Sequence, residues 1–124
     1  FLEKTACMID DDASMLRLLD LAIQRLGNVK VFTERTGSRA MEVIKSCNPD
    51  LVILDIEMPG MNGIEVCQQL RKDEGFLSIP IIAHSGLSRR KHENRILTAG
   101  FDEFLPKGHS MKKKMKLFKK YLHL

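Results

Sequence analysis

The stretch that decides the fold is residues 51–55, which read Leu51-Val52-Ile53-Leu54-Asp55. Four consecutive apolar residues are typical of a central strand in a parallel sheet, because such a strand is buried on both faces. A carboxylate follows the run directly. Since open parallel sheets bind ligands at the carboxyl ends of their strands, Asp55 is predicted to lie at a functional edge.

Four more strand-like runs surround this one, at residues 5–9, 29–33, 79–85 and 101–105. Helical patterns of apolar residues fill the gaps and follow the last run, at residues 14–26, 37–47, 63–72, 88–99 and 110–122. Alternating strands and helices without a hairpin signal form βα units. The sequence therefore predicts an α/β fold, a doubly wound five-stranded parallel sheet with helices on both faces. Pro106 lacks an amide donor, which favours an edge position for the last strand.

The composition indicates one intracellular domain. A chain of 124 residues with 44% apolar content is the size of a single domain, and we expect that domain to span residues 1–124. The cysteines, Cys7, Cys47 and Cys67, lie within apolar patterns and form no CxxC spacing, so reduced thiols and a cytoplasmic location are expected. No apolar run reaches the roughly 20 residues of a membrane span, and no membrane association is expected.

The net charge of +4 is concentrated at one end of the chain. From Lys107 onward there are seven lysines and no acid, which leaves 13 basic and 16 acidic residues, or −3, before that point. The simplest interpretation of helix 110–122 is a solvated lysine face over an apolar stripe. Attraction to an acidic surface, nucleic acid or membrane is the second interpretation. Direct nucleic-acid binding is not expected, since the segment has no arginine.

Polar residues follow four of the five strand-like runs. Acidic residues 10–12 follow the first run, Asp55 follows the third, Ser85 ends the fourth, and Lys107 comes shortly after the fifth. The ends of parallel strands meet at one edge of the sheet. We therefore expect these groups to converge there.

Carboxylates held close together repel one another unless a cation shares the site. Oxygen ligands without His or Cys favour a hard cation, and Mg²⁺ suits a site that also holds phosphate. Asp55 can then act as a nucleophile that forms an aspartyl phosphate. Lys107 and the metal would neutralise the charge on the transferring phosphoryl group, and the Ser85 hydroxyl could donate a hydrogen bond to it.

With these motifs the chain resembles the receiver (REC) domain of two-component response regulators, and in particular the chemotaxis receivers. The resemblance covers nearly the whole length, and four blocks carry it: residues 9–12, 49–63, 80–86 and 99–107. It implies a flavodoxin-like (βα)5 fold with strand order 2-1-3-4-5.

The resemblance also implies roles for individual residues. Asp55 is the phosphoacceptor, and Ser85 and Lys107 contact the phosphate. Ser85 and Phe104 form the switch. The Mg²⁺ ligands are Asp10, Asp11, Asp55 and the backbone carbonyl of Glu57.

The implied function is that of a phosphorylation-dependent signalling switch. A sensor histidine kinase or phosphotransfer protein supplies the phosphoryl group, and the domain catalyses its own phosphorylation and dephosphorylation without being a conventional enzyme. Phosphorylation changes the face formed by residues 88–99, 101–105 and 110–122, which controls an effector or output domain. The same face is a candidate surface for a homodimer.

Two positions depart from the usual receiver pattern. Gly108 follows Lys107 where receivers usually carry proline, so the loop that aims Lys107 has a different backbone. Phe104 replaces a frequent tyrosine. A signal carried by a tyrosine hydroxyl at residue 104 is therefore excluded, whereas a signal carried by the packing of the Phe104 ring remains.

Several alternatives remain open on the residues alone. Asp12 is expected to cap the following helix rather than bind metal, and His84 is expected to be structural or on the surface. An aspartyl-phosphate phosphatase of the haloacid-dehalogenase type would use Asp55 and Glu57 as paired acids, but the acids at 10–12 and the short chain argue against it. A phosphate-independent pseudo-receiver would bind an acidic surface through its lysines, but the intact site residues argue against it.

Overall fold

The expected strands form one parallel sheet in the computed structural model, which describes residues 3–124. The sheet has the order β2-β1-β3-β4-β5, which confirms the predicted topology. Its strands are β1 (Lys4–Ile9), β2 (Val29–Glu34), β3 (Leu51–Leu54), β4 (Ile81–Ser85) and β5 (Glu103–Pro106). The all-apolar β3 lies at the centre and the strand that ends in Pro106 at one edge, as their sequences predict.

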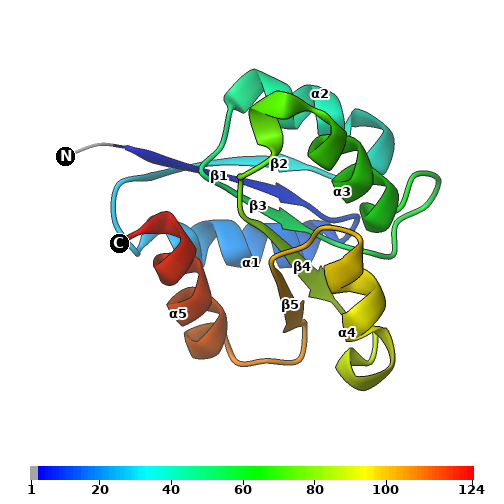
Figure 1. Cartoon of the computed structure of the whole chain (residues 1–124). Coiled ribbons are helices and arrows are strands. Elements are labelled where there is room, and N and C mark those ends of the chain that lie inside the picture. The colour runs from blue at the N-terminus through cyan, green and yellow to red at the C-terminus, as the bar shows by residue number, and fades with distance from the viewer. Residues whose placement is uncertain (1–2) are drawn as a thin grey trace.

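Helices cover both faces of this sheet (Figure 1). The helices are α1 (Ala13–Gln24), α2 (Gly37–Cys47), α3 (Gly63–Lys72), α4 (Arg89–Thr98) and α5 (Met111–Leu122). Helices α1 and α5 lie on one face, and α2 and α3 lie on the other (Figure 1). A short 3-10 helix, η1 (Glu74–Phe76), was not expected from the sequence.

Side-chain caps fix the starts of two helices beside the carboxyl edge of the sheet. The Asp12 carboxylate accepts hydrogen bonds from the amides of Ser14 and Met15, at 3.0 and 3.2 Å, so Asp12 caps α1 as predicted. Asn62 and Glu65 form a reciprocal capping box at the start of α3. These caps place the first turns of both helices next to the strand ends.

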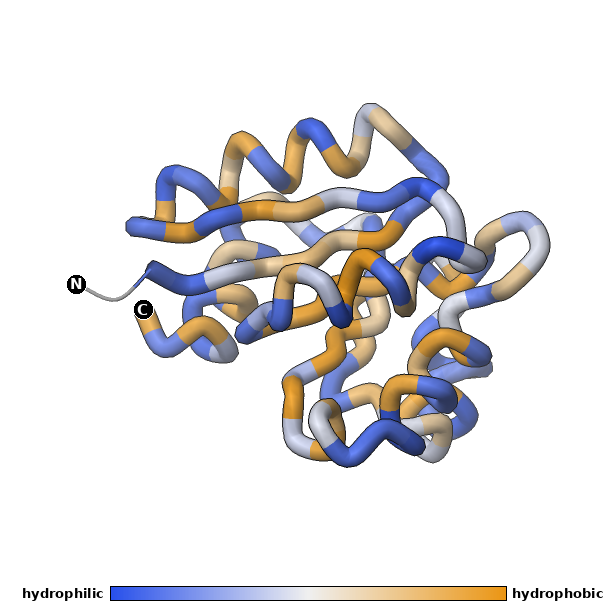
Figure 2. The backbone as a smooth tube through the Cα atoms, turned by 90° about the horizontal axis from the view of Figure 1, so that it is seen from above, coloured by the Kyte–Doolittle hydropathy of each residue, from blue (hydrophilic) through white to orange (hydrophobic). Residues whose placement is uncertain are grey.

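The apolar core has two layers, one on each face of the sheet. Side chains alternate along a strand, so Cys7 and Ile9 enter the layer under α2, α3 and α4, whereas Ala6 and Met8 enter the layer under α1 and α5. Figure 2 shows the corresponding pattern, with hydrophobic segments along the inner strands and alternating hydrophobic and hydrophilic segments along the helices. Burial of these two layers is the main force that assembles the sheet.

Helix α3 approaches the end of β3 very closely. A Cβ atom added at Gly63, the first residue of α3, would lie 2.0 Å from the Asp55 carbonyl oxygen. The Gly63 amide also donates a hydrogen bond to the Ile56 carbonyl at 2.9 Å. Glycine at this position lets the helix press against the backbone that carries Asp55.

Arg71, near the end of α3, ties together segments that are far apart in the sequence. Its guanidinium group donates to four carbonyl oxygens, those of Phe76, Leu77, Ile79 and Gly100, and it forms an ion pair with Asp102 at 2.9 Å. Asp102 in turn accepts a hydrogen bond from the Ile81 amide at 2.8 Å. These contacts anchor the segments that lead into β4 and β5.

Candidate functional site

Three carboxylates meet at the carboxyl edge of the sheet. Asp10 and Asp11 follow β1, and Asp55 follows β3, which pairs with β1 so that Ile9 lies opposite Leu54. One carboxylate oxygen from each acid lies within 4.8 Å of the others. Asp10 and Asp55 are each 3% exposed, whereas Asp11 is exposed. The three acids expected at the site are therefore brought together.

Lys107 joins this cluster from the loop after β5. Its Nζ lies 2.9 Å from Asp10 Oδ2 and 3.3 Å from Asp55 Oδ2. Burial disfavours the charged ammonium, but the contacts with Asp10 and Asp55 outweigh it, so the pKa of Lys107 is raised above its ordinary value. Lys107 thus stays charged between the two buried acids.

The electrostatics of the cluster favour an additional cation. Burial, followed by the nearby charge of Asp10, raises the pKa of Asp55 to about 7, although Lys107 opposes this shift. Asp10 Oδ2 is buried, and the Lys107 ammonium at 2.9 Å is its charged partner among residues 3–124. Buried, converging carboxylate oxygens are the ligands that Mg²⁺ prefers, so the donor set fits this ion.

Ser85 and Phe104 lie on the neighbouring strands β4 and β5, of which β5 is at the edge of the sheet. The buried Ser85 ends β4, and its hydroxyl oxygen accepts a hydrogen bond from the Leu87 amide at 3.0 Å. The Ser85 carbonyl accepts one from the Lys107 amide at 2.8 Å. Phe104 on β5 is 3% exposed and belongs to the core layer that Ile96 of α4 also enters. Phe104 is therefore a core aromatic in this structure.

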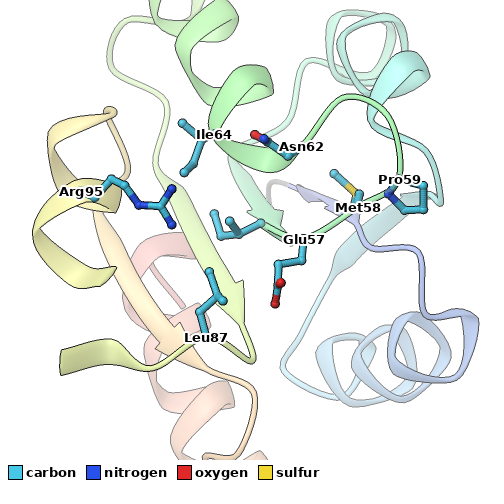
Figure 3. A pocket seen from close by; sticks show the side chains of 8 residues that line it. Glu57, Met58, Pro59, Asn62, Ile64, Leu87 and Arg95 are labelled. Atoms are coloured by element: carbon cyan, nitrogen blue, oxygen red, sulfur yellow. The ribbon is translucent and has the colours of Figure 1, made fainter. Parts of the chain in front are cut away.

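An open pocket borders the carboxyl edge between the loop after β3 and helix α4. Figure 3 shows its lining, with Glu57 and Met58 on the loop, Leu87 after β4, and Arg95 reaching over from α4. Glu57 is exposed. Ile56, the residue after Asp55, also lines this pocket, so the pocket lies beside the loop that follows Asp55.

The structure also places two residues near the site that the sequence did not single out for it. Lys114 of α5 is 3% exposed, and its Nζ donates a hydrogen bond to the Lys107 carbonyl at 2.8 Å. The prediction that helix 110–122 presents its lysines to solvent is therefore wrong for Lys114. His84, next to Ser85, is buried, so it is structural rather than on the surface. Burial, with the charges of Lys114 and Lys107, lowers its pKa to about 3.

A parallel α/β sheet that gathers three acids and one lysine at its carboxyl edge defines a class of protein, the phosphoryl-accepting signalling domains. The chain belongs to the response regulator receiver domain family, whose model matches residues 6–119. This finding confirms the resemblance seen in the sequence.

Individual relatives agree with the family assignment. The chain is 29% identical, over 119 residues, to the polar-differentiation response regulator DivK of Brucella ovis, and the match covers 96% of each chain. The BeF3-activated N-terminal receiver domain of Klebsiella pneumoniae RstA matches with a TM-score of 0.88 and 26% identity, covering 98% of this chain and 100% of that one. Chemotaxis protein CheY4 of Vibrio cholerae, at 21% identity and a TM-score of 0.89, has the same fold.

This membership establishes the general function. The chain is a phosphoryl-accepting switch of two-component signalling, and the phosphatase and pseudo-receiver alternatives are not favoured. Receiver domains generally use Mg²⁺ at an acidic site and interact with histidine kinases or phosphotransfer proteins and with effector domains. Within residues 3–124, none of the helices has the length and apolar character needed to cross a membrane.

Proposed function

We propose that Asp55 is the phosphoacceptor of this receiver domain. The observation that supports it most directly is the position of its carboxylate, which lies within 4.8 Å of acidic oxygens from Asp10 and Asp11 and 3.3 Å from the Lys107 ammonium. Asp55 is also the acid at the end of the central strand, where parallel sheets present their ligands. Nucleophile and positive charge therefore meet at one point.

The reaction transfers a phosphoryl group from a phosphohistidine of the donor to Asp55. An Asp55 carboxylate oxygen attacks phosphorus, the new O–P bond forms, and the P–N bond to the imidazole breaks with its electron pair remaining on nitrogen. Lys107 stabilises the negative charge on the phosphoryl oxygens. The Ser85 hydroxyl donates to one of these oxygens after it turns away from the Leu87 amide, which donates to it in this structure.

Asp10, Asp11 and Asp55, with the backbone carbonyl of Glu57, would hold Mg²⁺ at this edge. The ion would supply the positive charge that balances the crowded carboxylates and the incoming phosphoryl oxygens. Hydrolysis of the aspartyl phosphate by water returns the domain to its starting state. Glu57 and Leu87 line the pocket through which water approaches.

We further propose that Ser85 and Phe104 carry the signal to the face formed by α4, β5 and α5. Movement of the Ser85 hydroxyl toward the phosphoryl group would change the packing of Phe104 beneath α4. A sensor histidine kinase or phosphotransfer protein loads the site, and an effector, an output domain or a second copy binds the changed face. The three free thiols, Cys7, Cys47 and Cys67, support a reducing, cytoplasmic location.

The decisive test is intact-mass analysis after incubation with acetyl phosphate and Mg²⁺. One acid-labile phosphoryl group is expected on the wild-type chain and none on Asp55→Asn. Asp20→Asn is the matched control, because it removes an acid on α1 whose side chain accepts from Gln24. Labelling that persists in Asp55→Asn would refute the assignment.

The metal proposal has its own measurement. Mg²⁺ should raise the melting temperature of the wild-type chain and have a smaller effect on Asp11→Ala, since one ligand is lost. Equal stabilisation of both chains would place the ion elsewhere.

A further inference from the structure

The loop that carries Lys107 has few constraints of its own. Gly108 follows Lys107, a Cβ atom there would meet no atom within 4 Å, and no peptide bond within residues 3–124 is cis. The Lys107 amide donates to the Ser85 carbonyl at 2.8 Å, and the His109 amide donates to the Pro106 carbonyl at 3.1 Å. Neither bond holds the Lys107 carbonyl.

Lys114 holds that carbonyl from the neighbouring helix. Its Nζ donates to the Lys107 oxygen at 2.8 Å, and only 3% of the Lys114 residue is exposed. Both backbone polar groups of Lys107 are thus fixed, the amide by β4 and the carbonyl by α5. From this fixed backbone the Lys107 side chain reaches Asp10 and Asp55, at 2.9 and 3.3 Å.

A lysine at this buried position is unfavourable for stability. Burial lowers the pKa of Lys114, the nearby Lys107 ammonium lowers it further, and Asp10 only partly opposes these effects. The other fully buried residues of α5, Phe118 and Leu122, are apolar. An apolar side chain would fill the position of Lys114 at lower cost, so its N–H donors have a specific use.

The buried His84 adds no further positive charge beside Lys114. His84 lies close enough to Lys114 and Lys107 for both ammonium groups to depress its pKa, which burial lowers first, to about 3. The imidazole is therefore neutral near pH 7 and adds no third positive charge. Neither ring nitrogen of His84 has a hydrogen-bond partner within the described chain, so a lone pair is free to accept from a nearby ammonium.

We infer that Lys114 is a positioning residue, whose hydrogen bond to the Lys107 carbonyl fixes the loop and directs the Lys107 ammonium at Asp10 and Asp55. This inference rests on the proposed function of Asp55. Lys114 acts through Lys107 rather than on the phosphoryl group. Helix α5 thus constrains the loop at the Lys107 carbonyl, directly before Gly108.

The test compares Lys114→Met with Lys113→Met. Methionine keeps the length and apolar stem of Lys114 without its donors, and Lys113 is an exposed lysine of the same charge one residue earlier. The rate of phosphate uptake from acetyl phosphate, at saturating Mg²⁺, should fall about 10- to 100-fold in Lys114→Met, as expected for a misplaced charged group. The Lys113→Met rate should match the wild type, and an equal rate in both variants would overturn the inference.

A double-mutant cycle separates positioning from a general structural effect. In a Lys107→Met background, Lys114→Met should cause no further loss of rate, because the group that it directs is already absent. A second, multiplicative loss would instead show that Lys114 acts independently of Lys107 and would refute the inference. Thermal unfolding of each variant checks that all chains compared are folded.

A further measurement does not need phosphate uptake at all. The Lys107 ammonium, held between two carboxylates, should give a protected ¹H–¹⁵N signal in the wild type and in Lys113→Met. That signal should be lost in Lys114→Met, and its survival unchanged would contradict the inference. If the wild-type chain accepts no phosphate, the proposed function fails, while this signal still decides the role of Lys114.

Discussion

Substitution of Gly63 by alanine should destabilise the protein, although alanine is the better helix former. The added Cβ would lie 2.0 Å from the Asp55 carbonyl oxygen and 3.0 Å from Ile56 Cα. Both are backbone atoms, and carbon–oxygen contacts this short do not occur, so α3 or the end of β3 must move by about 1 Å. Overpacking of this kind costs about 3 kcal/mol, and alanine recovers at most about 1 kcal/mol through helix propensity.

The expected net loss for Gly63→Ala is therefore about 2 kcal/mol in the free energy of unfolding, measured by urea titration followed by circular dichroism. Gly108→Ala is the matched control, because no atom lies within 4 Å of the added carbon; its change should stay within about 0.5 kcal/mol. Phosphate uptake should also slow in Gly63→Ala, since the displaced backbone carries Asp55. A variant as stable as the wild type would refute the idea that this contact positions the acid.

Two further predictions concern charge. Without Mg²⁺, the free energy of unfolding of the wild type should fall as pH rises from about 4 to 7. The pKa of Asp55, which faces Asp10, Asp11 and Lys107, is about 7 in the folded chain against an ordinary 3.8. Over this range the unfolded chain therefore loses its proton from Asp55 more readily than the folded chain. Asp55→Asn should then be more stable than the wild type at pH 8, by roughly 2–4 kcal/mol, and about equally stable at pH 4. Urea titrations at both pH values measure this difference. A variant that is less stable than the wild type at pH 8 would contradict the prediction. Arg71→Met should lose about 3 kcal/mol in the same assay, since four carbonyls and an acid lose their donor, and a loss below about 0.5 kcal/mol would show that the contacts contribute little.

Much of the fold could be predicted because its signals are local and periodic. The run 51–54 has no polar side, which is typical of a central strand buried on both faces of a sheet. The predicted ends of strands and helices are less accurate where a local residue, such as a proline, overrides the apolar pattern. The fourth strand begins at Ile81 rather than residue 79, after Pro80, which has no amide to donate to a neighbouring strand.

The candidate site was predictable in its main parts for a geometric reason. Parallel strands end at one edge, so acids after the first and third runs and a lysine after the fifth must converge, and Asp10, Asp11, Asp55 and Lys107 do so. The orientation of the Ser85 hydroxyl toward Leu87 could not be read from the sequence, because it depends on the path of one loop.

The roles of Lys114 and Arg71 could not be predicted, because the partner of Lys114 and most partners of Arg71 are backbone carbonyls. A carbonyl has no residue type, so no pattern of letters marks it as an acceptor. Lys114 also lies among exposed lysines, where composition favours a solvated face. The available signal was its helical spacing, since Lys114 lies four residues before the buried Phe118 and eight before Leu122.

The hydrogen bond from the Lys107 amide to the Ser85 carbonyl has a consequence for how the switch can move. The backbones that carry the Ser85 hydroxyl and the Lys107 ammonium are joined by this bond at 2.8 Å, so we expect their movements to be coupled. If the end of β4 shifts toward Asp55, we expect the backbone of Lys107 to move with it, and the hydrogen bond from Lys114 to pass part of this movement to α5. A small movement at one strand end would then reach the lysine-rich helix α5 through two hydrogen bonds.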